Sequence, residues 1–200
     1  MERGGLEPGV PGQFFMLSPP GRLLPRPMSL CLAPPGELAF LLEVVGPGTR
    51  ALAALDSGAE LAVFGPLGNG FRLDVGRPLL VGGGVGMAPF PYASEALGGP
   101  PAMLGFRSAA HAEAAALVPQ AEVVVEPTYV TECLPGGKWD VLACGPEPML
   151  ERVRALAPTA QLAWEAPMAC GYGGCYGCVV EVEGRLKRLC VDGPVLEAAA

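Results

Sequence analysis

Four cysteines near the C-terminus stand at a spacing that suits metal ligation. Four residues separate Cys170 from Cys175, two separate Cys175 from Cys178, and eleven separate Cys178 from Cys190. A C-x4-C-x2-C run with a fourth, more distant cysteine is a ligand pattern of [2Fe-2S] clusters, which thiolates hold. We therefore expect Cys170, Cys175, Cys178 and Cys190 to bind such a cluster and the chain to pass electrons through it.

Glycines fill most of the gaps in this cysteine run. A loop that wraps an anionic cluster needs positive φ angles and inward N–H groups, and glycine supplies both most easily. The glycines concerned are Gly171, Gly173, Gly174 and Gly177. A four-cysteine zinc site and unrelated free thiols are the alternatives. A Rieske-type site is excluded, because it needs two histidines and His111 is the only one in the sequence.

A second candidate site is a glycine-rich loop in the middle of the chain. The apolar run Leu79–Val81 leads into Gly82, Gly83, Gly84 and Gly86. Backbone N–H groups where a strand turns into a helix can hold a pyrophosphate. The loop lacks the Rossmann spacing, so a plain strand-to-helix turn is the alternative.

Cys144, Gly145 and Pro146 follow another apolar run. Ligands of open α/β sheets bind outside the carboxyl ends of the parallel strands. These residues therefore outline one crevice together with the glycine loop, although alone they could form only a tight turn.

Arg26, Pro27, Met28 and Ser29 form a third candidate site. A guanidinium group suits a diphosphate, and Ser29 with the nearby backbone could bond a flavin. In isolation, however, an arginine beside a proline is more often part of an exposed turn.

The composition narrows the classes of function. The chain has 29 glycines and 23 prolines among 200 residues, but half of its residues are hydrophobic and its net charge is only -7, so it should fold, with short strands between turns. A pI near 4.8 leaves no basic surface for nucleic acid. The uncharged stretch 78–94 is broken by glycine and proline and makes a poor membrane helix. No secretory signal is visible, so the seven cysteines are expected to be reduced, in the cytoplasm.

Three segments with different patterns must position these sites. Up to about residue 74, short apolar runs alternate with Gly/Pro clusters, which predicts a small antiparallel barrel or sandwich. These runs are Gln13–Leu17, Leu38–Val45 and Glu60–Phe64. A cysteine-rich module from about Glu165 is followed by a hairpin of Val179–Val182 and Arg185–Leu189 that turns at Glu183-Gly184.

Between these two segments, strands alternate with alanine-rich helical stretches, which predicts a parallel α/β domain. The predicted strands are Pro78–Val81, Ala102–Phe106, Glu122–Val125 and Asp140–Ala143. The predicted helices are Pro91–Leu97, His111–Leu117 and Glu147–Leu156. The fold class is therefore α+β, with several domains.

In this order the motifs resemble the electron-transfer subunit family of the NAD-linked, two-subunit dihydroorotate dehydrogenases, a branch of the ferredoxin reductases. The resemblance covers nearly the whole chain. Its most specific parts are the segments 65–71, 82–86, 105–108 and 143–150, and the cysteine module that ends at 190–195.

The resemblance implies three domains. They are an FAD-binding β-barrel over residues 1–75, an NAD-binding α/β domain over 76–160 and a [2Fe-2S] domain over 161–200. Arg26 to Ser29 would hold FAD, together with the strand of Leu41, Leu42 and Glu43 and the turn at Gly48-Thr49. The glycine loop and Cys144 to Pro146 would bind NAD.

The chain also departs from the family pattern. It begins close to Pro11 without the barrel strand that usually comes first, so the expected barrel is shortened at its N-terminus. The stretch between Val125 and Thr131 is short and lacks an acidic, glycine-containing loop, and Glu43 stands where a basic residue is common.

These parts predict an electron relay. Electrons from dihydroorotate would leave the FMN of a partner catalytic subunit, cross the cluster singly, collect on FAD and leave as hydride to NAD. We expect a hetero-oligomer, a heterotetramer by resemblance, in UMP biosynthesis, and we expect no catalytic acid or base on this chain. The alternatives are a reductase subunit for a hydrogenase, a glutamate-synthase-like enzyme or an oxygenase, or a non-enzymatic iron-sulfur redox sensor.

Overall fold

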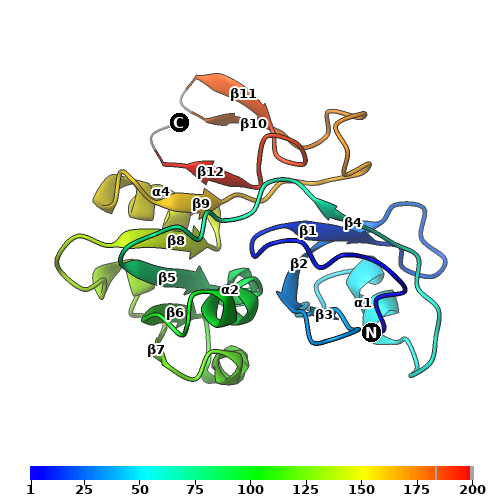
Figure 1. The fold of residues 1–200 in the computed structure, drawn as a ribbon, viewed down its shortest axis with the longest axis horizontal. Coiled ribbons are helices and arrows are strands. Elements are labelled where there is room, and N and C mark those ends of the chain that lie inside the picture. The colour runs from blue at the N-terminus through cyan, green and yellow to red at the C-terminus, as the bar shows by residue number, and fades with distance from the viewer. Residues whose placement is uncertain (183, 199–200) are drawn as a thin grey trace.

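A computed structural model describes residues 1–182 and 184–198, and its N-terminal part is an antiparallel sheet (Figure 1). The strand order is β3-β2-β1-β4. The strands are β1 (Phe14–Leu17), β2 (Arg26–Leu32), β3 (Ala39–Phe40) and β4 (Val63–Leu67). All four residues of β1 are buried, and Phe15 packs in a core with Leu30, Leu38 and Leu52. Closure of this four-stranded sheet into a barrel stays a prediction.

Two of the strands predicted here are misplaced. The predicted strand Leu38–Val45 is a strand only at Ala39–Phe40, because its pairing with β2 is already irregular and the residues after Phe40 form a cavity wall instead. The predicted strand Glu60–Phe64 is shifted to Val63–Leu67.

The predicted turn at Gly48-Thr49 lies in a helix, α1 (Pro47–Ala53). Pro47 suits the first helical position. The Oγ1 atom of Thr49 accepts hydrogen bonds from the backbone N–H groups of Val45 and Gly46, at 3.0 and 3.2 Å. These contacts start the helix where the sequence indicated only a turn.

The middle of the chain forms a six-stranded sheet in the order β12-β9-β8-β5-β6-β7. Its strands are β5 (Pro78–Gly83), β6 (Ala102–Phe106), β7 (Ala121–Val125), β8 (Asp140–Cys144), β9 (Gln161–Ala163) and β12 (Val195–Glu197). The first five pair in parallel, and β12 pairs antiparallel with β9. The predicted parallel α/β arrangement is therefore confirmed.

The connecting helices are short. They are α2 (Phe90–Ala96), α3 (Ala109–Ala112) and α4 (Glu147–Leu156), with 3-10 turns η1 (Gly84–Met87), η2 (Glu113–Leu117) and η3 (Val130–Glu132). The bounds predicted for α4 are confirmed. The predicted helix His111–Leu117 is instead split between α3 and η2, and nothing in its residue types marks the change at Glu113.

The cysteine module ends in the predicted hairpin of β10 (Val179–Val182) and β11 (Arg185–Arg188). Of its predicted turn, Gly184 has φ +74° and Glu183 lies outside the described residues. The sequence analysis did not predict β9 and β12, which pair with each other and place both ends of the range 161–200 in the large sheet. No helix of the described chain is long and apolar enough to span a bilayer.

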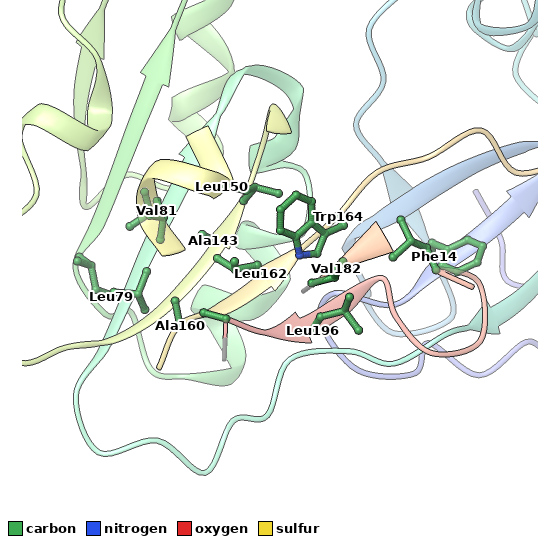
Figure 2. Close-up of a cluster of buried hydrophobic side chains, with 14 of the residues drawn as sticks. Phe14, Leu79, Val81, Ala143, Leu150, Ala160, Leu162, Trp164, Val182 and Leu196 are labelled. Atoms are coloured by element: carbon green, nitrogen blue, oxygen red, sulfur yellow. The ribbon is translucent and has the colours of Figure 1, made fainter. Parts of the chain in front are cut away.

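One buried cluster joins the three parts of the chain. Figure 2 shows Trp164 packed between Leu150 and Leu162 of the α/β layer and Val182 of the hairpin, with Phe14 of β1 beyond. Cys178 and Cys190 belong to the same cluster and are 1% and 3% exposed. The cysteine site is therefore attached to the core shared by the two sheets.

Candidate functional site

The β10–β11 hairpin brings the third and fourth cysteines of the motif together. The Leu189 N–H donates to the Cys178 carbonyl at 3.1 Å, which aligns the start and end of the hairpin. The Cys178 and Cys190 sulfur atoms are 3.2 Å apart, and the Gly173 N–H donates to Cys190 Sγ at 3.1 Å. Burial, followed by the neighbouring Cys178, raises the pKa of Cys190 to about 11.

Cys170 and Cys175 form a second, more exposed pair. The pKa of Cys170 is lowered to about 6, first by the backbone N–H of Tyr172 and then by the backbone and side chain of Cys175, although burial acts to raise it. The Gly177 N–H points at Cys175 Sγ, at 3.4 Å. The loop thus presents N–H donors to sulfur, as its glycine content predicted.

Positive φ angles occur at only some of the predicted positions. Gly171 and Gly173 have φ of +81° and +86°, whereas Gly174 and Gly177 do not need this region. Tyr176 takes φ +59° instead, an uncommon conformation for a non-glycine residue.

The arrangement of the thiols distinguishes between a site for a single metal ion and a site for a two-iron cluster. Within residues 1–182 and 184–198, no three His, Cys, Asp or Glu side chains converge as one metal ion requires. The four thiols instead form two pairs, Cys170 with Cys175 and Cys178 with Cys190. A [2Fe-2S] cluster takes two ligands on each of its two irons. The donor set therefore fits a two-iron cluster better than the zinc alternative.

A cavity of about 770 Å³ lies at the carboxyl ends of β5, β6 and β8. Its lining includes Gly83, Gly84, Gly86, Gly145 and Pro146, all predicted dinucleotide contacts. A Cβ on Gly86 would stand 2.5 Å from the Gly145 Cα, so the two loops touch backbone to backbone. The volume suits a dinucleotide-sized ligand.

Two of the predicted dinucleotide contacts lie under this cavity rather than on its wall. Gly82 and Cys144 are register partners in the buried sheet. A Cβ on Gly82 would meet Leu104 and Phe90, so this glycine serves packing. Burial, and next the charge of Glu165, raise the pKa of Cys144.

A smaller cavity of about 240 Å³ adjoins the first. Its lining includes the predicted flavin contacts Pro27, Met28, Ser29, Leu41, Leu42, Glu43 and Thr49. Five residues line both cavities: Leu41, Leu42, Glu43, Val85 and Glu165. The two cavities therefore meet at one junction, where ligands bound in both would be neighbours.

Arg26 and Gly48 line neither cavity. The Arg26 Nη1 atom donates to the carbonyls of Leu24 and Pro25, at 2.9 and 3.1 Å. Its guanidinium group lies so close to Gly48 that a Cβ atom at position 48 would clash with it. The FAD-binding role predicted for these two residues stays a prediction.

Sequence reasoning missed several wall residues. Trp164 lines the smaller cavity, and its Nε1 atom is buried without a hydrogen-bond partner in the described chain, as expected where a further group completes the site. His111 lines the larger cavity and lies 3.7 Å from Glu43. One sequence signal could have found Trp164 and Glu165. They directly follow a short apolar run, where a parallel strand ends.

Comparison with known proteins gives consistent matches. The sequence model of one family, described as the iron-sulfur cluster binding domain of dihydroorotate dehydrogenase B, matches residues 165–200. The dihydroorotate dehydrogenase B (NAD(+)) electron transfer subunit of Clostridium perfringens is 35% identical over 92% of this chain and 83% of its own length. The subunit of the same name from Geobacillus thermodenitrificans is 36% identical over 94% and 85%.

Solved structures support the same fold. A structure described as NADH-dependent reduced ferredoxin-NADP oxidoreductase, from work on flavin-based electron bifurcation, matches with a TM-score of 0.82 and 26% identity, over 95% of this chain and 78% of that one. The siderophore-interacting protein SipS of Aeromonas hydrophila matches with a TM-score of 0.53 and 18% identity, over 74% and 79%, and shows the fold alone.

Proposed function

This chain belongs to the family of electron transfer subunits of NAD-dependent dihydroorotate dehydrogenase B, and we propose that it carries electrons from dihydroorotate oxidation to NAD in pyrimidine biosynthesis. It is an oxidoreductase subunit, and its cofactors are a [2Fe-2S] cluster and FAD, with NAD as acceptor. The observation that carries the proposal is the geometry. Two pairs of thiols lie next to a hydrophobic core, and residues of the same core line two adjoining cavities.

The cofactors supply chemistry that side chains lack, because a cluster passes single electrons whereas a flavin can pair them for hydride transfer to NAD. The chain holds each group in a separate place. The four motif cysteines would hold the cluster. The β2 residues Pro27 to Ser29 and the segment Leu41–Glu43 would enclose the flavin, with Thr49 beside them. The η1 loop and Gly145 would hold the nucleotide, since close backbone approach is what such loops provide.

The partner is proposed to be an FMN-containing dihydroorotate dehydrogenase catalytic subunit, in a heterotetramer. The cysteine loop supports a docking site at the cluster, since Cys175 is exposed and Tyr172 and Tyr176 are 66% and 64% exposed. Large exposed aromatic side chains are typical of protein interfaces.

The domain boundaries 1–75, 76–160 and 161–200 and the β-barrel stay part of the proposal. Support for the barrel comes from the four-stranded antiparallel sheet and from the ferredoxin-reductase-like fold of the matching structure. A reducing, cytoplasmic location is also proposed and is supported by seven free cysteines.

Reconstitution tests the proposal directly. The chain, loaded with FAD and a [2Fe-2S] cluster, is mixed with an FMN-containing dihydroorotate dehydrogenase subunit, and NADH formation from dihydroorotate is followed at increasing ratios of the two. Turnover should rise with the ratio and saturate at a fixed stoichiometry. A stable complex without NADH formation, or no complex at all, would remove the pyrimidine assignment.

A parallel sample separates the alternative partners. A ferredoxin or another one-electron donor replaces the dihydroorotate dehydrogenase subunit at the same concentration. Faster NAD reduction with that donor than with the dihydroorotate dehydrogenase subunit would assign the chain to a different reductase.

A further inference from the structure

A cation lies against the cysteine loop that would hold the [2Fe-2S] cluster. The guanidinium group of Arg188, on β11, is so close to Gly173 that a Cβ placed on this glycine would stand 3.4 Å from Nη1 and 3.9 Å from Cζ. The Arg188 Cζ atom also lies 5.6 Å from the centroid of the Tyr176 ring, within reach of a cation–π interaction. The guanidinium group therefore packs on the loop on both sides of Cys175.

The backbone of Gly173 connects this cation to one of the motif cysteines. The Gly173 N–H group donates to Cys190 Sγ at 3.1 Å. Cys190 also follows Arg188 closely along the chain, just after β11 ends. The positive charge is therefore fixed near the Cys190 sulfur in two ways, by its packing on the loop and by the strand that carries it.

One carboxylate lies beside Arg188 but does not pair closely with its guanidinium group. Asp192 Oδ2 accepts a hydrogen bond from the Arg188 backbone N–H at 2.7 Å, whereas the Arg188 Nε atom is 3.9 Å from the same oxygen. The longer separation exceeds a hydrogen bond, so the backbone is what fixes the carboxylate. The guanidinium group is therefore placed by the loop on which it packs rather than by a tight ion pair.

A permanent positive charge at this place affects how easily the cluster accepts an electron. A cluster held by four thiolates is an anion, and each electron that it accepts adds one negative charge, with no bond broken. A nearby cation favours the added charge and so raises the reduction potential. The chain as a whole acts in the opposite direction, because its net charge is -7. In this acidic chain, a local cation is therefore what favours the reduced cluster.

We propose that Arg188 raises the reduction potential of the [2Fe-2S] cluster through its charge, and so makes the cluster a better acceptor for the partner's electrons. The inference rests on the proposed function, in which single electrons from dihydroorotate oxidation enter the cluster and leave to FAD. Asp192 acts in the opposite direction, because its carboxylate partly offsets the guanidinium charge. Arg188 is therefore an electrostatic residue of the relay, distinct from the four cysteines that would ligate the iron.

The test measures the midpoint potential of the cluster in the chain loaded with FAD and cluster. The [2Fe-2S] electron paramagnetic signal is recorded at a series of controlled potentials for the wild type and for the variants Arg188→Gln, Arg188→Lys, Asp192→Asn and Arg185→Gln. Arg185 provides the matched control, because it is an exposed arginine on the same strand. It stands three positions from Arg188, so the two side chains leave opposite faces of the hairpin.

For Arg188→Gln we expect the equilibrium constant for reduction of the cluster to fall by about tenfold, which is about 59 mV for one electron. Arg188→Lys keeps the charge and should recover most of this loss, and Arg185→Gln should match wild type. Asp192→Asn should raise the potential, because it removes a negative charge and keeps an oxygen acceptor for the Arg188 N–H. The difference between wild type and Arg188→Gln should shrink at high ionic strength, because salt screens a partly exposed charge.

Equal potentials in wild type and Arg188→Gln would overturn the proposal, and so would an equal fall in Arg185→Gln. A loss that Arg188→Lys does not recover would assign the effect to packing and would also overturn it. If Arg188→Gln assembles no cluster, Asp192→Asn decides: a higher potential supports the charge effect, and an unchanged or lower one overturns it.

Failure of the proposed function looks different. If the wild-type chain shows no [2Fe-2S] signal at any potential, the cluster assignment fails and this proposal falls with it. If the potentials of the variants differ as expected but the reconstituted complex forms no NADH, the pyrimidine assignment fails and the role of Arg188 stands.

Discussion

At the scale of single residues, the four motif cysteines have unequal environments. Cys170 is lined by backbone N–H groups that lower its pKa to about 6, so it is a thiolate near neutral pH. Cys190 is buried, and its pKa is raised to about 11. Because iron binds thiolates, Cys170 is prepared for the metal, whereas Cys190 must lose its proton as the cluster assembles.

Cys178 gives the first prediction. Replacing Cys178 with Ser removes a soft thiolate from the buried pair, so the [2Fe-2S] electron paramagnetic signal of the reduced chain should be lost, and bound iron should fall to near zero. Cys133→Ser is the control, because Cys133 is exposed and outside the motif. An unchanged signal in Cys178→Ser would show that the ligand assignment is wrong.

Cys31 gives a prediction about alkaline pH. Burial raises its pKa in the folded chain from 9.0 to about 11. Between these values the unfolded chain releases the Cys31 proton while the folded chain keeps it, so the free energy of unfolding falls as pH rises. The fall from this residue is up to about 1.4 kcal/mol for each pH unit.

The contribution of Cys31 is isolated by comparison with Cys31→Ala. Urea unfolding at pH 8, 9 and 10 should give a steeper loss of stability for the wild type than for the variant. Cys144 contributes in the same direction but equally in both proteins, because burial raises its pKa as well. Parallel stability curves for the two proteins would contradict the shift.

At the scale of elements, the nucleotide cavity depends on two loops that touch. A Cβ on Gly86 would stand 2.5 Å from the Gly145 Cα and 2.7 Å from the Cys144 carbonyl oxygen. Since all of these are backbone atoms, the loops must move apart to accept a side chain.

Gly86→Ala should therefore weaken NADH binding by about 10-fold, or about 1.4 kcal/mol, while FAD binding stays close to wild type. Titration of the FAD-loaded chain with NADH measures the first, and flavin fluorescence the second. Gly136→Ala is the matched control, because a Cβ there meets nothing within 4 Å. Equal NADH affinity in both variants would mean that the nucleotide does not depend on this contact.

The elements also show what the sequence could predict. Local patterns were sufficient for the buried runs of β5 and β6 and for α4, whose acidic residue and proline mark its first turn. They were insufficient for β9 and β12, which are three residues long and pair with each other across about thirty residues of chain. Glu165 was missed for the same reason, because it follows β9, and only the pairing of β9 with β8 places the end of that strand at the cavities.

At the scale of the whole molecule, the sites border one shared core. Trp164, which packs in the buried cluster of Figure 2, lines the smaller cavity, and Cys178 and Cys190 belong to the same cluster. The smaller cavity in turn shares Glu165 with the larger one. Asn69 adds a polar link, since its Nδ2 atom donates to the carbonyls of Val191 and Asp192 at 3.3 and 3.0 Å. These hydrogen bonds tie the cysteine module to the segment that follows β4. The cysteine site and the cavities therefore belong to one packed unit.

The exposed face of the cysteine loop is the surface where the partner is expected. Tyr172 stacks edge-on against Phe64 of β4, with 6.4 Å between ring centroids, and both rings are more than half exposed. Tyr176 lies in the same cysteine loop, with Arg188 over its ring. An exposed aromatic group next to redox-active thiols fits a docking site for the catalytic subunit, because electron transfer requires the partner's cofactor to come close to the cluster.

The double substitution Tyr172→Ser with Tyr176→Ser should weaken the complex with the catalytic subunit by about 10- to 100-fold, the effect of losing aromatic interface anchors. Affinity is measured by titration of the loaded chain, with cluster content checked by electron paramagnetic resonance. Val123→Thr is the control, because Val123 is exposed on β7, the sheet edge opposite β12. NADH oxidation by an artificial acceptor at the flavin should be unchanged in the double variant, since that reaction needs no partner. If the control weakens the complex and the tyrosine variant does not, the partner docks on the nucleotide-binding side instead.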